Sequence, residues 1–174
     1  MQCSDLLDDA FARIPAVVRH AVAGLDRDAL TWQPEPGANP IGWLVWHLTR
    51  VQDDHVAELA GAEQTWFDGG WAPRFGLSEA TTDIGYGHSL EQVMVIQPEG
   101  VDALLEYLDE VTARTRAFLT TIDADELDRV VDTSWDPPVT MGVRLVSVIS
   151  DSLQHAGQAA YLRGVYDRTV HTQR

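Results

Sequence analysis

Apolar residues recur every three or four positions in four stretches of this chain, and that spacing predicts amphipathic helices. The four stretches cover residues 5–25, 40–61, 101–122 and 141–163. Helices of roughly 20 residues, each with one apolar stripe to bury, pack side by side. The pattern therefore predicts an all-α fold, a four-helix bundle, with a long loop between the second and third helices.

Residues at the ends of these stretches indicate where the helices begin and end. Asn39 suits the N-cap of the second helix, and Pro40 suits its first position, where the missing N–H does no harm. Gly61 is expected to end the same helix. Thr140 can cap the fourth helix, and Gly164 is expected to end it.

The segment between the second and third helices, residues 62–97, has no helical periodicity and is rich in glycine and aromatic residues. It predicts a long ordered loop, and such loops in compact domains are often functional. A loop that only covers the end of the bundle explains the segment equally well. Residues 123–140 form a second connection, with a short turn expected at 125–129. Nothing resembles a domain linker, so residues 1–174 are expected to form a single domain.

The charge balance and the cysteine content restrict the partners and the location. The chain has 27 acidic and 12 basic residues, a formal net charge of −15. Nucleic-acid binding needs Lys and Arg against phosphates, so the charge argues against it. Acidic pairs such as Asp53 and Asp54 are interpreted as solvated surface. No apolar run approaches the roughly 20 residues that span a bilayer, so no membrane is expected. The acidic N-terminus differs from an export signal, and the single cysteine, Cys3, suits the cytoplasm.

Asp151 and His155 lie four positions apart in the fourth predicted helix, so their side chains share one face. His47, on the second predicted helix, can supply a third ligand to a divalent metal ion. Two histidines and one carboxylate leave coordination positions open, as in catalytic metal sites. Alternatives stay open, because such pairs are often solvated and a lone histidine on a packed helix is often a hydrogen-bonded core residue.

The other histidines are poorer candidates for ligands. His20 falls on an exposed face of the first helix, His88 lies in the long loop, and His171 lies in the C-terminal tail. His55 is eight residues after His47, too far along the helix to share one ion. It is expected to contact substrate or the ligands, or to be exposed. Motifs of zincins, P-loop proteins, serine hydrolases and di-iron bundles are missing from the sequence.

Two motifs, NPIGWLVWHLTRVQDDHVAELAG and SDSLQHAGQAAYLRG, resemble those of the DinB-like metal-binding four-helix bundles. The resemblance covers nearly the whole chain and is closest to the branch that contains the metal-binding domain of mycothiol-dependent maleylpyruvate isomerase. It implies that His47, Asp151 and His155 are the metal ligands. Many members have histidine at all three positions, and the isomerase has Glu where this chain has Asp151. Because Asp is one methylene shorter, the helix must approach the ion more closely or the affinity falls.

The resemblance also implies a function, a metal-dependent S-transferase or isomerase that uses a low-molecular-weight thiol such as mycothiol on a small electrophile. Zn²⁺ is the first expectation for the metal, and Ni or Fe also fits the ligands. Gln158, Arg144 and His55 are expected to contact substrate, although Arg144 can instead form a surface salt bridge. A homodimer is expected, as in many relatives. The alternatives are a non-catalytic metal or small-ligand binding bundle and a metal-free structural dimer.

Overall fold

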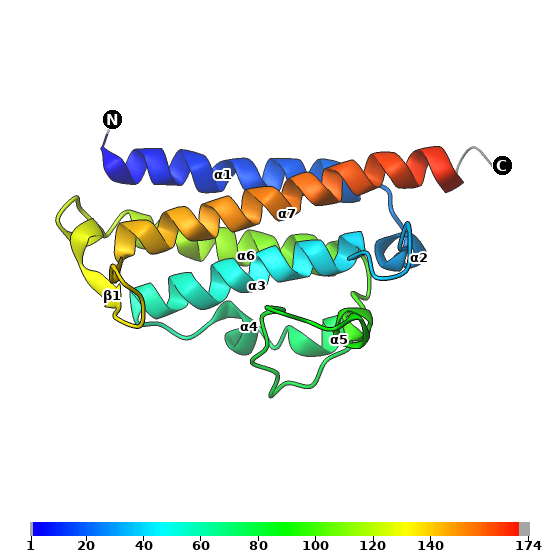
Figure 1. The fold of residues 1–174 in the computed structure, drawn as a ribbon, viewed down its shortest axis with the longest axis horizontal. Helices are drawn as coiled ribbons and strands as arrows, with labels where there is room; N and C mark the ends of the chain where they lie inside the picture. Colours follow the sequence, from blue (N-terminus) through cyan, green and yellow to red (C-terminus); the bar gives the residue numbers. More distant parts are fainter. Residues whose placement is uncertain (1, 171–174) are drawn as a thin grey trace.

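Four long helices form the framework of the computed structural model, which describes residues 2–170. They are α1 (Cys3–Val22), α3 (Ile41–Ala60), α6 (Val101–Leu119) and α7 (Met141–Val170). The helices lie side by side as a bundle (Figure 1), which confirms the predicted all-α fold. Among residues 2–170, none of the helices has the length and apolar character needed to cross a membrane.

The four helices do not simply alternate in direction. Helices α1 and α7 run one way along the bundle, and α3 and α6 run the other way (Figure 1). Helix α3 packs antiparallel against α7, and α6 packs antiparallel against α1. Ion pairs such as that of Arg116 with Asp8 join α1 to α6. Because α3 and α6 are parallel, the chain between them must return along the whole bundle. This is the physical reason for the long segment that the sequence predicted as a loop.

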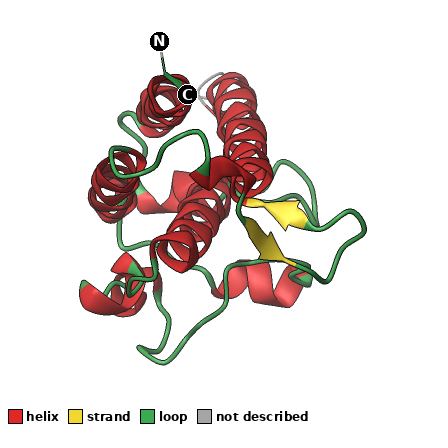
Figure 2. Cartoon of the chain, turned by 90° about the vertical axis from the view of Figure 1, so that its left-hand side faces the viewer, coloured by secondary structure: helices red, strands yellow, loops and turns green. Residues whose placement is uncertain are grey.

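Short helical turns organise this returning segment and the other connections. The return contains α4 (Thr65–Asp68), the 3₁₀ helix η1 (Ala72–Phe75) and α5 (Leu90–Val95), and α2 (Arg27–Thr31) precedes α3. After α6 come η2 (Glu126–Asp128) and an antiparallel hairpin of β1 (Val130–Asp132) and β2 (Val139–Thr140), at one end of the bundle (Figure 2). The predicted turn near 125–129 is present. The hairpin was not predicted, because strands this short carry no periodic signal.

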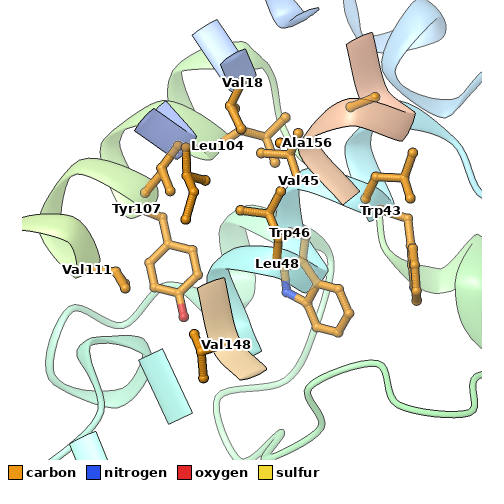
Figure 3. Packing of buried hydrophobic residues seen from close by; sticks show 14 of the residues in the cluster. Val18, Trp43, Val45, Trp46, Leu48, Leu104, Tyr107, Val111, Val148 and Ala156 are labelled. Carbon is orange, nitrogen blue, oxygen red and sulfur yellow. The ribbon is translucent and has the colours of Figure 1, made fainter. Parts of the chain in front are cut away.

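Helix α3 lies at the centre of the structure. Sixteen of its 20 residues are buried, so it has no solvated face of the kind that amphipathic helices present. Its Trp46 and Leu48 pack among Tyr107, Leu104 and residues of α7 (Figure 3). The position of α2 adds to this burial, because a Cβ at Gly42 would lie 2.9 Å from the carbonyl oxygen of Leu30.

Two of the predicted helix ends are confirmed and one is displaced. Gly61 adopts the left-handed conformation, with φ of 63°, just after α3. The hydroxyl of Thr140 accepts a hydrogen bond from the N–H of Val143 in the first turn of α7. The prediction for Asn39 was wrong by one residue, because Pro40 is the N-cap and α3 begins at Ile41.

The prediction that Gly164 ends the last helix was wrong, because α7 continues to Val170. Contacts beyond the glycine stabilise this extension. Arg163 forms an ion pair with Asp167 one turn later and donates hydrogen bonds to two carbonyls at the end of α1. Tyr166 packs edge-on against Trp32, with ring centroids 5.4 Å apart. Tertiary packing thus overrides the weak helix propensity of glycine.

Candidate metal centre

The antiparallel packing of α3 on α7 brings together the three residues that the sequence singled out. His47, Asp151 and His155 each offer one ligand atom, and these atoms lie within 4.8 Å of one another. His47 is buried, whereas Asp151 and His155 are half-buried. The group is therefore reachable from the side on which α7 contributes its ligands. Whether it holds a metal ion stays a prediction.

Hydrogen bonds fix which ring nitrogen of each histidine carries the proton. The Nδ1 of His47 lies 2.5 Å from the carbonyl oxygen of Ile84, and a carbonyl only accepts, so Nδ1–H is the donor. The Nδ1 of His155 lies 2.8 Å from Oε1 of Gln158 and donates in the same way. The Nε2 lone pair of His47 is left free, whereas Nε2 of His155 faces Oδ1 of Asp151. Such an arrangement is typical of histidine ligands, whose other nitrogen is held by a carbonyl or carboxylate.

The carboxylate of Asp151 has an unused oxygen. Its Oδ1 lies 3.6 Å from Nε2 of His155, while its Oδ2 is buried and has no hydrogen-bond partner among the described residues. Buried polar atoms are rarely left without a partner. Two imidazole nitrogens and this oxygen form a donor set that Zn²⁺ and similar divalent ions accept. The residues present therefore fit a divalent metal ion.

The pKa directions of His47 and Asp151 favour coordination, whereas that of His155 favours a proton that a metal ion would have to displace. Burial lowers the pKa of His47, partly offset by its hydrogen bond to Ile84, so this ring is neutral at pH 7 and able to coordinate. The hydrogen bond to Asp151 raises the pKa of His155 against the effect of burial. Burial alone would raise the pKa of Asp151, but the hydrogen bond and charge of His155 outweigh it and lower the value. The carboxylate is thus ionised at neutral pH.

An aromatic ring covers one face of His47. Trp43 stacks on His47 with ring centroids 4.7 Å apart, and it meets His155 edge-on at 6.2 Å. The indole N–H of Trp43 donates to Nδ1 of His88 at 3.1 Å. The sequence placed His88 in a loop without a role, yet only 4% of its side chain is exposed. No periodic pattern could have revealed this contact, because it joins α3 to the irregular returning segment.

Comparison with known proteins identifies the family. A family model described as Mycothiol-S-transferase matches residues 6–168. The chain belongs to this family. The predicted DinB-like membership is thereby confirmed. Among solved structures, this family member is similar to one titled "Crystal structure of the conserved protein of locus from Enterococcus faecalis", with 30% sequence identity and a TM-score of 0.85. The match covers 94% of this chain and 96% of the other chain. No curated protein matches the chain.

The residues predicted to contact substrate lie on α3 and α7, the helices that carry the candidate ligands. Gln158 touches the centre directly through its bond to His155. Arg144 and His55 pair with each other instead, with 3.1 Å between a guanidinium nitrogen and Nδ1 of His55. Arg144 also forms a salt bridge with Asp132 of the hairpin at 2.8 Å. Burial, and next the charge of Arg144, lower the pKa of His55. Arg144, His55 and Asp132 form a polar cluster beside the hairpin.

The interpretation of Asp53 as solvated surface was wrong, because its side chain is only 4% exposed. Asp53 accepts hydrogen bonds from the N–H groups of Thr65 and Trp66 at 2.9 and 2.8 Å, which caps α4. It also accepts from the hydroxyl of Tyr107 at 2.8 Å and pairs with Arg50, whose side chain is fully buried. Asp53 belongs to a buried ion pair with Arg50, which lies one helical turn after His47.

Proposed function

We propose that this protein is a metal-dependent S-transferase that joins a low-molecular-weight thiol of the mycothiol type to a small electrophile. His47, Asp151 and His155 would hold the ion, with Zn²⁺ first and Ni or Fe as alternatives. The observation that carries the proposal is that the ligand atoms of His47, Asp151 and His155 lie within 4.8 Å of one another, beside a buried Oδ2 of Asp151 that has no hydrogen-bond partner among the described residues. Membership of the mycothiol S-transferase family supports the thiol substrate.

Three protein ligands leave further coordination positions open for substrate. A bound divalent ion there would act as a Lewis acid and keep a thiol in its reactive thiolate form. The residues of the chain would set the direction of approach. Trp43 blocks one face of His47, so the thiol would enter beside the half-buried Asp151 and His155. Gln158 would keep the ring of His155 in place through the bond to Nδ1. The sulfur would then bond to the electrophilic carbon, whose leaving group departs with the bonding electrons.

The surroundings offer different chemistry on the two sides of the centre. A groove of about 530 Å³ lies beyond Gln158 and is lined mainly by apolar residues such as Leu44, Tyr161 and Leu162. We assign it to the apolar part of the electrophile. Toward the hairpin lies the polar cluster of Arg144 and His55, which we assign to hydrogen-bonding groups of the thiol cosubstrate.

Further expectations from the sequence remain part of this proposal: a single domain, a cytoplasmic location and a homodimer. The outer face of α7 supports the dimer, because Val143, Val146 and Tyr161 are 53%, 59% and 74% exposed. A metal-free structural dimer would use the same face. It explains the orphaned oxygen of Asp151 less well, since a hydrogen-bond network would be expected to satisfy that atom.

Metal content tests the proposal directly. We expect wild-type protein, purified without a His-tag, to contain about one equivalent of Zn, Ni or Fe by elemental analysis. His155→Ala should lose it, and His20→Ala, which changes an exposed histidine of α1, should retain it. The loaded wild-type protein should then consume a mycothiol-type thiol together with an electrophile such as monobromobimane. Metal without turnover of any thiol would favour the non-catalytic binding bundle, and no metal after reconstitution would refute both.

A further inference from the structure

Residues 81–88 of the returning segment run across the back of the candidate metal centre, and we call them the strap. The strap makes its closest approach at Gly85. An added Cβ there would lie 2.7 Å from Nδ1 of His47, 2.9 Å from the ring of Trp46 and 3.2 Å from the ring of Trp43. Gly85 also has φ of 93°, a conformation that favours glycine. Only a residue without a side chain lets the preceding carbonyl, that of Ile84, reach His47.

Buried side-chain donors of α3 and α4 attach the strap to the bundle. Arg50 lies one turn after His47 on α3 and donates to the carbonyl oxygens of Asp83 and Thr82 at 3.3 and 3.4 Å. The indole N–H of Trp66 donates to the carbonyl of Thr81 at 2.9 Å. The guanidinium of Arg50 is fully buried, so these carbonyls compensate a charge that water cannot reach.

A chain of side-chain hydrogen bonds closes the strap on its outer side. Trp43 can only donate through its indole, so Nδ1 of His88 accepts and Nε2 of His88 carries the proton. That Nε2–H donates to Oδ2 of Asp83 at 2.7 Å, and Oδ1 of Asp83 accepts from the N–H of Gly85 at 2.8 Å. The chain therefore begins on the tryptophan that stacks on His47 and ends on the glycine that faces the same ring.

We propose that the strap is a positioning device for His47. The carbonyl of Ile84 holds His47 as the Nδ1–H tautomer and directs its Nε2 toward Asp151 and His155. Gly85 is the position on which this contact depends. This inference deepens the proposed function and rests on it, because positioning His47 serves a purpose only if His47 binds a metal ion. The tautomer of His47, in contrast, is a property of the protein without metal. None of the strap residues touches the substrate; they act through His47.

The chain offers a matched pair of substitutions for the test. Gly85→Ala and Gly87→Ala both place a side chain at a positive φ within the strap, at 93° and 70°. A Cβ at Gly87 meets nothing within 4 Å, whereas a Cβ at Gly85 meets His47 and its neighbours. Backbone strain is therefore common to both variants, and displacement of the strap from His47 is specific to Gly85→Ala. Asp83→Ala is the third variant, in case Gly85→Ala does not fold. It removes the exposed carboxylate that accepts a hydrogen bond from the N–H of Gly85.

Two measurements on these variants decide the inference. Long-range ¹H–¹⁵N spectra of metal-free protein should show the Nδ1–H tautomer of His47 in wild type and Gly87→Ala, and loss of that single tautomer in Gly85→Ala. Titration with Co²⁺, followed by its visible absorption, should give 10–100-fold weaker binding for Gly85→Ala. Gly87→Ala should stay within about threefold of wild type, because strain alone lowers stability and not affinity.

The Nε2–H tautomer in wild type would overturn the inference, and so would equal spectra and equal Co²⁺ affinity for Gly85→Ala and Gly87→Ala. If Gly85→Ala does not fold, Asp83→Ala must show the same loss of the tautomer, and an unchanged tautomer there overturns the inference as well. Wild-type protein that binds no Co²⁺ would refute the proposed function, while the spectra would still decide whether the strap sets the tautomer of His47.

Discussion

Replacing Asp53 by alanine should destabilise the protein far more than replacing its neighbour Asp54. The carboxylate of Asp53 accepts three hydrogen bonds of 2.8–2.9 Å, from Thr65, Trp66 and Tyr107. It also lies 3.4 Å from Arg50, and the two side chains are 4% and 0% exposed. Asp53→Ala therefore removes the counter-charge of a guanidinium that water cannot reach and uncaps α4.

The size of the effect follows from the burial of the pair. Removing one partner of a buried ion pair costs about 3–5 kcal/mol, because the other charge stays buried and uncompensated. The side chain of Asp54 is 30% exposed and accepts one hydrogen bond, from Gln64. Asp54→Ala should cost about 0.5–1.5 kcal/mol, the usual net value of a single hydrogen bond. The two variants remove the same group from adjacent positions, so their difference reports burial.

Urea unfolding, followed by circular dichroism on metal-free protein, measures both variants. With a slope of about 2 kcal/mol/M, a loss of about 4 kcal/mol lowers the midpoint by roughly 2 M for Asp53→Ala. A variant that is unfolded without urea would exceed the expected loss, and Asp53→Asn, which keeps the shape of the side chain, would then replace it. Equal midpoints for Asp53→Ala and Asp54→Ala would refute the argument that Asp53 compensates Arg50.

Two further predictions concern pH and packing. Because the pKa of His55 is lowered on folding, the unfolded chain binds the proton more tightly, so wild type should lose stability as the pH falls through about 6.5. His55→Gln should lose less between pH 7.5 and 5.5 in the same urea assay, and an equal loss would contradict the assignment. Gly42→Ala should lower the melting temperature, since the new Cβ would lie 2.9 Å from the carbonyl of Leu30. Gly157→Ala lies in open space within α7 and should instead raise the free energy of unfolding by about 0.5–1 kcal/mol. Calorimetry on both variants tests this, and a higher melting temperature for Gly42→Ala or a lower one for Gly157→Ala would contradict it.

Asp151 and His155 were recognisable as a candidate ligand pair because local spacing carries their geometry, whereas the choice of His47 as the third ligand rested on the resemblance to the DinB-like bundles. Asp151 and His155 share a face at any helical i and i+4 pair, and His47 lies in a helix that the bundle must pack against theirs. The four long helices follow from the same periodicity. For the pair on α7 and for the helices, the information lies within one or two turns of helix.

Features that depend on contacts between distant segments were not predictable in this way. The burial of Asp53 depends on α4 and on Tyr107, which lie far along the chain. Amphipathic reasoning assigns one solvated face to every helix, whereas α3 is covered on nearly all sides. The roles of Gly85 and His88 depend on how an irregular segment folds back over α3, and no periodic pattern encodes that path.

The burial of Arg50 has a consequence for how the strap moves. Long connections in small domains usually open by themselves, before the core does. Here such an opening would strip a fully buried guanidinium of two of its acceptors, so the strap and the bundle belong to one cooperative unit. The buried amide of Gly85, which donates to Asp83, should accordingly exchange hydrogen with solvent only when the bundle itself unfolds. His47 is then held in place before any ligand binds, and ligands would exchange on the side of the half-buried Asp151 and His155.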